Sequence, residues 1–113
     1  MHELSLAEDM LDMIVQRSKE DGFERVSKVW LEVGKLSHVE AEAMEFCFDA
    51  VMAGSLVEGA VLEIIASEGM GQCLHCKTTS RIEYLYDPCT YCGKFGLDIT
   101  QGDQVRIKSL EVH

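Results

Sequence analysis

The 113-residue chain is poor in basic side chains and has no long apolar run. It carries 10 Lys and Arg against 20 Asp and Glu, which gives a formal net charge of -10. Nucleic-acid-binding proteins cluster Lys and Arg against phosphates, so this balance argues against a nucleic-acid partner and against an anionic membrane surface. No apolar run approaches the roughly 18–20 residues of a membrane-spanning helix. An acidic surface suits basic protein surfaces and does not repel a divalent cation.

Two kinds of motif are also missing. The first residues lack the basic stretch followed by an apolar stretch that marks a signal peptide, so we expect a cytoplasmic protein. The sequence shows no nucleophile–base set, no phosphate-binding loop and no cluster of polar residues typical of a catalytic pocket. It therefore predicts a protein that is not an enzyme.

The amphipathic pattern predicts two helices. Residues 5–21 form the first, with Ser5 and Glu8 as a capping box and Gly22 as its stop. Its apolar face consists of Ala7, Met10, Leu11, Ile14, Val15 and Ser18. A second capping box, Ser37 to Glu40, predicts the start of the other helix, which Gly54 would end. Its apolar face consists of Val39, Ala43, Phe46, Cys47, Ala50 and Val51.

Alternating residues predict three strands, at 24–33, 60–66 and 104–112. We expect an α+β fold in which both helices pack on one face of a small sheet. The segment between the second and third strands differs in character. Residues 68–102 contain five of the nine glycines, the single proline and four of the five cysteines. We predict an inserted zinc-ribbon-like domain at 68–102 and an α/β domain made of 1–67 plus 103–113.

The four cysteines of this segment form two Cys-x-x-Cys pairs, Cys73 with Cys76 and Cys89 with Cys92. A tight turn of this spacing presents two thiolates to one ion, and two such turns complete a tetrahedral zinc site. Four thiolates would also suit the iron of a rubredoxin-type electron carrier, and Cys-x-x-Cys alone can be a redox dithiol. Zinc is the preferred interpretation.

The amino terminus is a possible chelate. The amine of Met1 and the backbone nitrogen and imidazole of His2 can bind one ion, and Glu3 can supply a further donor. Ni²⁺ and Cu²⁺ favour such nitrogen-rich, tetragonal sites. Glu40 has two interpretations: it partners Ser37 in the capping box, or it reaches this metal site.

Together these motifs resemble the HypA/HybF family of nickel-insertion accessory proteins for NiFe-hydrogenase maturation. The resemblance rests on Met1-His2-Glu3-Leu4-Ser5, Trp30-Leu31-Glu32-Val33-Gly34, the paired Cys-x-x-Cys motifs and Ser109-Leu110-Glu111-Val112. It implies a nickel-binding domain with an inserted zinc domain. It also implies nickel at Met1 and His2, with Glu3 and Glu40 as further contacts, and zinc at the four paired cysteines.

The resemblance implies a metallochaperone that hands nickel to the hydrogenase large-subunit precursor with a HypB-type GTPase. Some family members also serve urease, which makes urease accessory proteins further candidate partners. Some members carry a histidine directly after a Cys-x-x-Cys pair, where this chain has Lys77 and Gly93. The alternative is a zinc-ribbon module that binds other proteins and has no nickel function.

Overall fold

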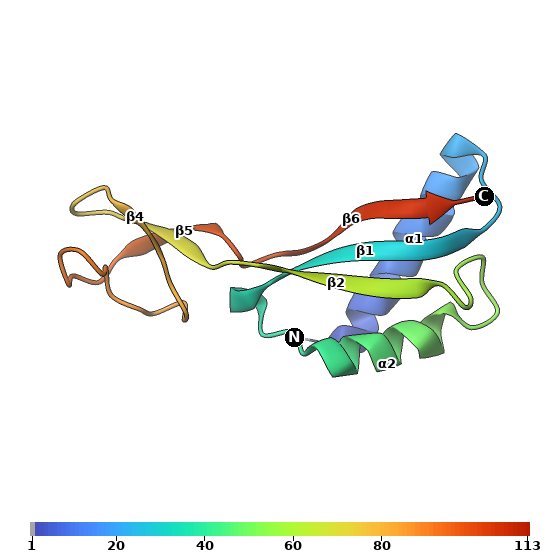
Figure 1. Ribbon diagram of the computed structural model, residues 1–113, viewed down its shortest axis with the longest axis horizontal. Helices are drawn as coiled ribbons and strands as arrows, with labels where there is room; N and C mark the ends of the chain where they lie inside the picture. The colour runs from blue at the N-terminus through green and yellow to red at the C-terminus, as the bar shows by residue number, and fades with distance from the viewer. Residues whose placement is uncertain (1) are drawn as a thin grey trace.

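The computed structural model describes residues 2–113 as an elongated molecule of 52 × 26 × 17 Å with a sheet at each end (Figure 1). Met1 lies outside the described residues. The first sheet contains β1 (Val26–Gly34), β2 (Val61–Ser67) and β6 (Val105–Val112) in the order β2-β1-β6. The second contains β3 (Met70–Cys73), β4 (Thr79–Arg81) and β5 (Leu97–Gln101) in the order β4-β3-β5.

The central strand of the first sheet is β1, which pairs in parallel with β2 and antiparallel with β6. Parallel neighbours need a crossover connection, and α2 (Ala41–Met52) supplies it. The strand that follows the four-cysteine segment therefore returns to the first sheet, as its alternating sequence predicted. All three predicted strands of this sheet are confirmed to within about two residues.

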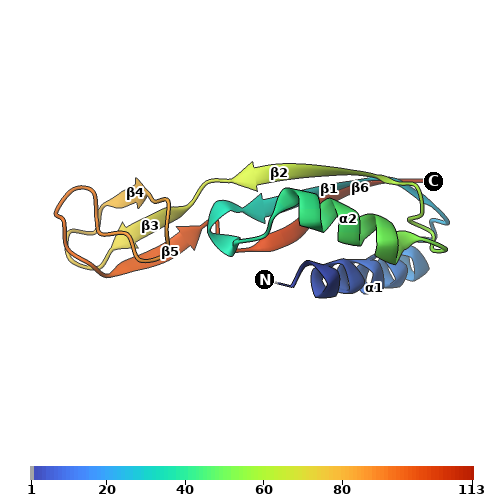
Figure 2. The ribbon, with the colours of Figure 1, turned by 90° about the horizontal axis from the view of Figure 1, so that it is seen from below.

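Both helices, α1 (Glu3–Asp21) and α2, lie on the same face of the first sheet (Figure 2). This arrangement confirms the predicted α+β class. The core between the layers is formed by small and aliphatic side chains of α1, larger ones of α2 and the inward row of β1. Its members include Ala7, Met10, Ile14, Met44, Phe48, Met52, Val26, Val29 and Leu31.

The predicted capping box at the start of the first helix is wrong. The helix begins at Glu3, two residues earlier than predicted, with His2 at the N-cap and no side-chain capping bond. Ser5 therefore lies inside the first turn. The predicted end is confirmed, because Gly22 adopts φ 79° and its N–H donates to the Ser18 carbonyl.

The second capping box is also wrong. Ser37 belongs to a short 3-10 helix, η1 (Lys35–Ser37), and its hydroxyl donates to the Gly34 carbonyl at 2.6 Å. Because that hydroxyl is used locally, it does not cap α2. The N-cap of α2 is Glu40, which makes no side-chain capping bond.

The buried face of α2 is turned by about one residue from the predicted one. Met44, Phe48 and Met52, spaced four apart, face the core, whereas Phe46 is 77% exposed. Cys47 is half-buried at the margin of this face. The helix has apolar residues on more than one face, so its packing against α1 decides which face is buried.

Close backbone contacts join the two sheets. A Cβ atom placed on Gly69 would lie 2.7 Å from the Ile82 carbonyl oxygen, and one on Gly102 would lie 2.6 Å from that of Glu68. Hydrogen bonds from Leu36 N–H to the Gly102 carbonyl, at 2.8 Å, and from Ile82 N–H to Gly69 complete the junction. We call this glycine-lined junction the waist.

Within residues 2–113 no helix is both long and apolar enough to cross a membrane. The half of the molecule that contains the second sheet buries few side chains, chiefly Cys73, Ser80, Ile82 and Cys89. Since so small a set of apolar contacts stabilises a fold only weakly, a further constraint is needed there.

Candidate metal sites

The four paired cysteines converge at the end of the molecule distant from the helices. Their sulfur atoms all lie within 4.8 Å of one another. The Sγ atoms of Cys73 and Cys92 are 3.7 Å apart, as are those of Cys76 and Cys89. All four are free thiols, and each close pair joins a cysteine of one turn to a cysteine of the other.

These separations fit a tetrahedral ion. With metal–sulfur bonds of about 2.3 Å, the sulfur atoms at the corners of a tetrahedron lie about 3.8 Å apart. The observed 3.7 Å is far longer than the roughly 2.05 Å of a disulfide. The arrangement therefore suits a four-thiolate metal such as zinc.

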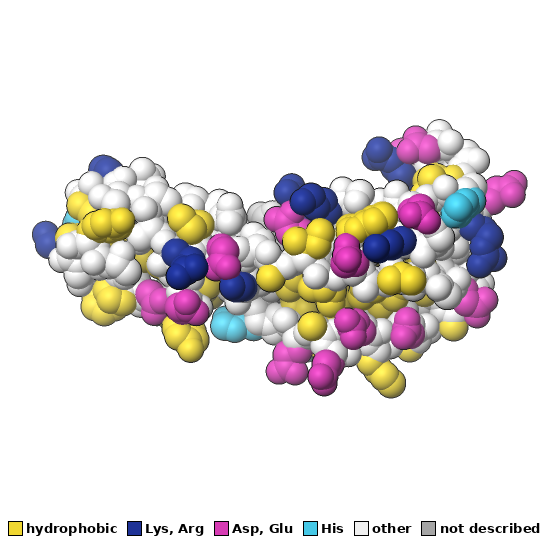
Figure 3. Space-filling model, viewed as in Figure 1, with side chains coloured by type: hydrophobic (Ala, Val, Ile, Leu, Met, Phe, Trp, Pro, Cys, Tyr) yellow, Lys and Arg dark blue, Asp and Glu magenta, His cyan; other side chains and the backbone are white. Residues whose placement is uncertain are grey.

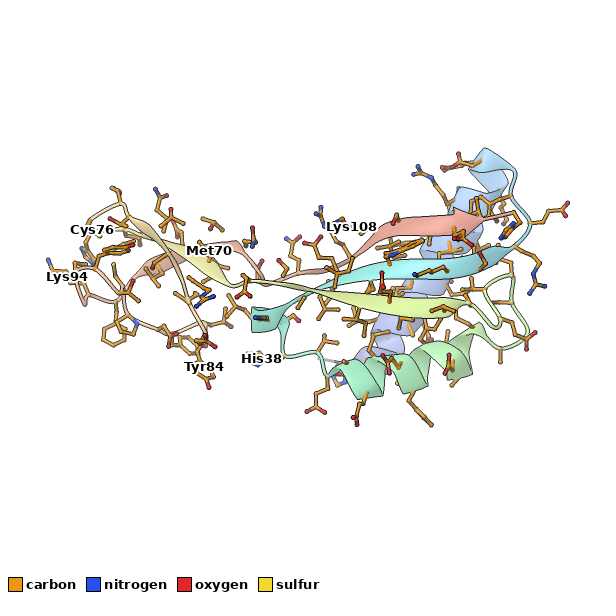
Figure 4. All side chains as sticks on the ribbon, viewed as in Figure 1. His38, Met70, Cys76, Tyr84, Lys94 and Lys108 are labelled. Atoms are coloured by element: carbon orange, nitrogen blue, oxygen red, sulfur yellow. The ribbon has the colours of Figure 1, made fainter. Side chains whose placement is uncertain are left out.

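The two turns are built alike. The N–H of Cys73 donates to the Thr78 carbonyl at 3.0 Å, and the N–H of Cys89 donates to the Lys94 carbonyl at 2.9 Å. Each bond spans five residues and folds its turn around the first sulfur of the pair. The cluster is shown on the ribbon in Figure 4, where Cys76 and Lys94 are labelled.

Backbone N–H groups also point at the sulfurs. His75 N–H donates to the Sγ of Cys73 at 3.3 Å, and Tyr91 N–H donates to the Sγ of Cys89 at 3.4 Å. Hydrogen bonds to sulfur favour its anionic form, which is the form that binds a metal. The two accepting cysteines are buried, whereas Cys76 and Cys92 lie nearer the solvent.

The thiols of Cys76 and Cys92 have widely different pKa values. Hydrogen bonds from the hydroxyl and backbone of Thr78 lower the pKa of the Cys76 thiol to about 6. The Lys94 backbone N–H lowers the pKa of Cys92, but burial and the neighbouring sulfurs outweigh it and raise that pKa to about 11. Four adjacent thiolates repel one another, so the four thiols do not all ionise readily by themselves. A bound divalent cation offsets the negative charges and removes this repulsion. Sequence reasoning missed Thr78, although a hydroxyl residue two positions after a cysteine pair is a visible signal.

His75, between the first two cysteines, is exposed and does not join the sulfur cluster. Its Nε2 atom lies 3.2 Å from the Phe95 carbonyl oxygen. It therefore links the two turns at their surface, and the cluster is completed by cysteine alone.

The amino-terminal candidates occupy the opposite half of the molecule. His2 is exposed and Glu3 is half-buried in the first turn of α1. The carbonyl oxygen of His2 accepts the N–H of Leu6 at 3.1 Å, so the helix anchors this residue's main chain. The predicted Met1 donors lie outside the described residues.

Glu40 is exposed at the N-cap of α2, and α1 and α2 begin at the same end of the helical layer (Figures 1 and 2). In the described part of the chain, the four cysteines form the one group of three or more metal-ligating side chains. The side chains of His2, Glu3 and Glu40 thus do not assemble a site by themselves. The predicted chelate differs from such a cluster because it takes donors from the main chain and the Met1 amine.

Comparisons with known proteins match nearly the whole chain to proteins of one family. The family model described as "Hydrogenase/urease nickel incorporation, metallochaperone, hypA" matches residues 1–112. The chain is 47% identical over 112 residues to the hydrogenase maturation factor HypA of Azotobacter chroococcum mcd 1, with 99% of each protein covered. Identity to the factor of the same name from Azotobacter vinelandii is 45%, again with 99% of each covered.

The fold also matches a solved structure. The solution structure of the Ni metallochaperone HypA from Helicobacter pylori superimposes with a TM-score of 0.77 at 25% identity. The match covers 99% of this chain and 97% of the other.

Proposed function

The chain belongs to the HypA family of metallochaperones for nickel incorporation in hydrogenase maturation, and from this membership we propose that it binds Ni²⁺ at its amino terminus and delivers it to the NiFe-hydrogenase large-subunit precursor. The observation that carries the proposal is a family match that begins at residue 1 and includes the exposed His2. In this role nickel is cargo, bound and released in turn.

The proposed donors are the Met1 amine, the backbone nitrogen and imidazole of His2, and Glu3. Support comes from the position of His2 directly before α1. The positive end of a helix dipole disfavours a bare cation but favours a deprotonated, anionic amide nitrogen. A nitrogen-rich chelate of Ni²⁺ is therefore compatible with a helix start, whereas a purely ionic site would be disfavoured there.

Glu40 is the proposed further ligand. Its competing role was capping with Ser37, and that role is ruled out because the Ser37 hydroxyl donates to Gly34. The Glu40 carboxylate makes no capping bond, so it is not committed to the helix. Its place at the start of α2, at the same end of the helical layer as the start of α1, supports a role in holding the cargo.

The four cysteines are proposed to hold a structural Zn²⁺. Zinc is supported by the all-thiolate donor set and by the absence of any open position among four protein ligands. A structural ion would supply the stability that the small second sheet lacks. A ferric site of the same geometry would absorb visible light, so a colourless purified protein distinguishes zinc from iron.

The proposed partners are a HypB-type GTPase and the hydrogenase large-subunit precursor, with urease accessory proteins as further candidate partners. The net charge of -10 and the acidic side chains that gather over α2 in Figure 3 support docking to basic protein surfaces. If this attraction contributes, association should weaken as salt is raised.

One titration tests the nickel proposal. Untagged protein should contain one zinc as purified and bind one further Ni²⁺ reversibly at neutral pH. His2→Ala should remove the nickel site and leave the zinc, since His2 lies in the other half of the molecule from the cysteines. His113→Ala is the matched control, because His113 is also exposed, and it should bind nickel as the parent does.

The alternative function is a zinc-ribbon interaction module without nickel. It is favoured by the exposure of four aromatic side chains in the four-cysteine segment, Tyr84, Tyr86, Tyr91 and Phe95. The same titration separates the two proposals. Unchanged nickel affinity in His2→Ala would remove the amino-terminal site and leave the interaction module as the better interpretation.

A further inference from the structure

The solvent-facing side of α2 carries a second apolar row, made of Ala43, Phe46 and Ala50. Residues spaced three and four apart lie on one face of a helix, so these three side chains are neighbours. Phe46 at the centre of the row is 77% exposed, and Ala50 is exposed beside it. This is part of the face that the sequence predicted to be buried. The core takes a different face of α2, and the apolar row is left open to solvent.

An acidic row runs along α2 beside the apolar row. It consists of Glu42, Glu45 and Asp49, which are all exposed and are again spaced three and four residues apart. Like charges at these spacings repel one another on the surface of a helix. Figure 3 shows the acidic side chains gathered over α2. The outer face of α2 therefore has an apolar row with a negatively charged flank.

The acidic row is not neutralised within the described part of the chain. From Lys35 to Lys77 the sequence contains no further Lys or Arg, and α2 lies wholly inside this interval. The ion pairs among residues 2–113 lie on α1, along the first sheet and at the waist, and none of them includes an acid of α2. A positively charged partner would therefore find these three carboxylates available.

The two rows together determine what the face fits. A helix laid along the apolar row would cover Phe46 with its own apolar side chains, and the small side chains of Ala43 and Ala50 permit its close approach. Side chains that flank the apolar seam of one packed helix reach the flank of the other, so Lys or Arg there would meet the acidic row. A second copy of this chain would instead bring another net charge of -10, which is unfavourable.

We propose that the outer face of α2 docks an amphipathic helix of a partner protein, with Lys or Arg along one flank of its apolar side. Phe46 is the apolar anchor, and the acidic row holds the basic flank. The contact extends over one helix of 12 residues, which suits a transient association. The inference rests on the proposed docking to basic protein surfaces, to which it assigns a place, and it does not depend on the amino-terminal nickel site.

The test uses a synthetic helical peptide of about 18 residues, or five turns, with Leu along one face, Lys on its flanks and Gln elsewhere. It is titrated into the full zinc-loaded chain labelled with ¹⁵N, and amide shifts should change along α2. A peptide of the same composition with its Leu and Lys positions shuffled has the same charge but no apolar face. It should bind at least roughly tenfold more weakly.

Phe46→Ala should weaken binding of the amphipathic peptide by at least roughly tenfold, because it removes the apolar anchor at the centre of the contact. Met13→Ala is the matched control. It removes another exposed apolar side chain, 61% exposed on α1, and the peptide should bind as it does to the parent.

A second pair of variants tests the charge. Glu45→Gln combined with Asp49→Asn should weaken binding and reduce its salt dependence, because two carboxylates of the acidic row are neutralised. Glu8→Gln combined with Asp12→Asn is the matched control, since it makes the same two changes at the same spacing on the exposed side of α1. It should have a clearly smaller effect.

Equal binding of the two peptides, shift changes confined to elements other than α2, or equal effects of the two charge variants would each overturn the inference. Self-association through α2 would also overturn it, by making a second copy the occupant. His2→Ala should bind the peptide as the parent does. Failure of the nickel site therefore leaves the docking face intact, and failure of the peptide to bind leaves the nickel proposal untouched.

Discussion

Lys77 and Gly93 occupy the same position in the two cysteine turns, and both have left-handed backbones, with φ of 65° and 73°. Each N–H donates to the carbonyl of the first cysteine in its turn, Lys77 to Cys73 at 3.0 Å and Gly93 to Cys89 at 2.9 Å. The turns are therefore equivalent in backbone and differ in side chain. Only Gly93 adopts this conformation without steric cost.

Gly93→Ala should destabilise the four-cysteine half by about 1 kcal/mol, because a Cβ atom is disfavoured at positive φ. No neighbouring atom lies within 4 Å of that Cβ, so the backbone conformation is the whole cause. Lys77→Ala is the control and should be nearly neutral, since lysine already bears a Cβ. Competition with a zinc chelator measures the zinc affinity of both variants, and equal effects would show that the left-handed backbone at Gly93 is not the cause.

Cys73→Ser should abolish zinc binding and unfold the second sheet. The helical circular dichroism should remain, because α1 and α2 pack on the first sheet and their core contains no cysteine of the cluster. Cys47→Ser provides the comparison, since Cys47 is half-buried beside that core, and it should keep its zinc. Loss of the helical signal in Cys73→Ser would show that the two sheets fold as one unit.

Phe48→Ala should reduce the free energy of unfolding by about 3–5 kcal/mol, as expected for an aromatic side chain removed from a core. Phe48 is 1% exposed, whereas Phe46 on the same helix is 77% exposed. Phe46→Ala should therefore change stability by no more than about 0.5 kcal/mol. Urea denaturation of the two variants measures which face of α2 is buried. A larger loss of unfolding free energy in Phe46→Ala than in Phe48→Ala would support the face predicted from the sequence.

The pKa of the Glu68 carboxyl at the waist is lowered, chiefly by its hydrogen bond with Lys35, whose Nζ lies 2.6 Å away. A lowered folded pKa means that the pair contributes stability above the unfolded pKa of about 4.3, and this contribution is lost as pH falls through the folded pKa. The pair is exposed, so the effect on stability is small.

Lys35→Met should raise the Glu68 pKa, measured by carboxyl ¹³C shifts during a pH titration. Lys28→Met removes a lysine 3.9 Å from a different acid, Glu63, and should leave the Glu68 pKa unchanged. If both variants shift Glu68 equally, then general surface charge and not this contact is responsible.

Local patterns of residue type were enough to predict features that short-range geometry determines. The two Cys-x-x-Cys pairs predicted the sulfur cluster, because each such turn presents two thiols together. Gly22 predicted the end of α1, because glycine readily adopts the left-handed conformation of a helix end. Both capping boxes failed because Ser-x-x-Glu is also compatible with a serine inside a helix, as at Ser5, or bonded to a turn, as at Ser37.

Tertiary contacts determine the features that the sequence did not predict. Phe46 and Phe48 are alike in type, and only the packing of α2 against α1 exposes one and buries the other. The waist depends on close approach of Gly69 and Gly102, which are far apart in the chain. The proposed nickel site draws on the main chain, so side-chain patterns alone give it little signal.

The order of strands in the first sheet has a consequence for synthesis on the ribosome. The central strand β1 and its parallel neighbour β2 emerge early, but the antiparallel neighbour β6 follows the entire four-cysteine segment. Until β6 emerges, β1 keeps one edge unpaired and the core remains open on that side. By then all four cysteines have left the exit tunnel, so capture of an ion by them can precede closure of the helical half.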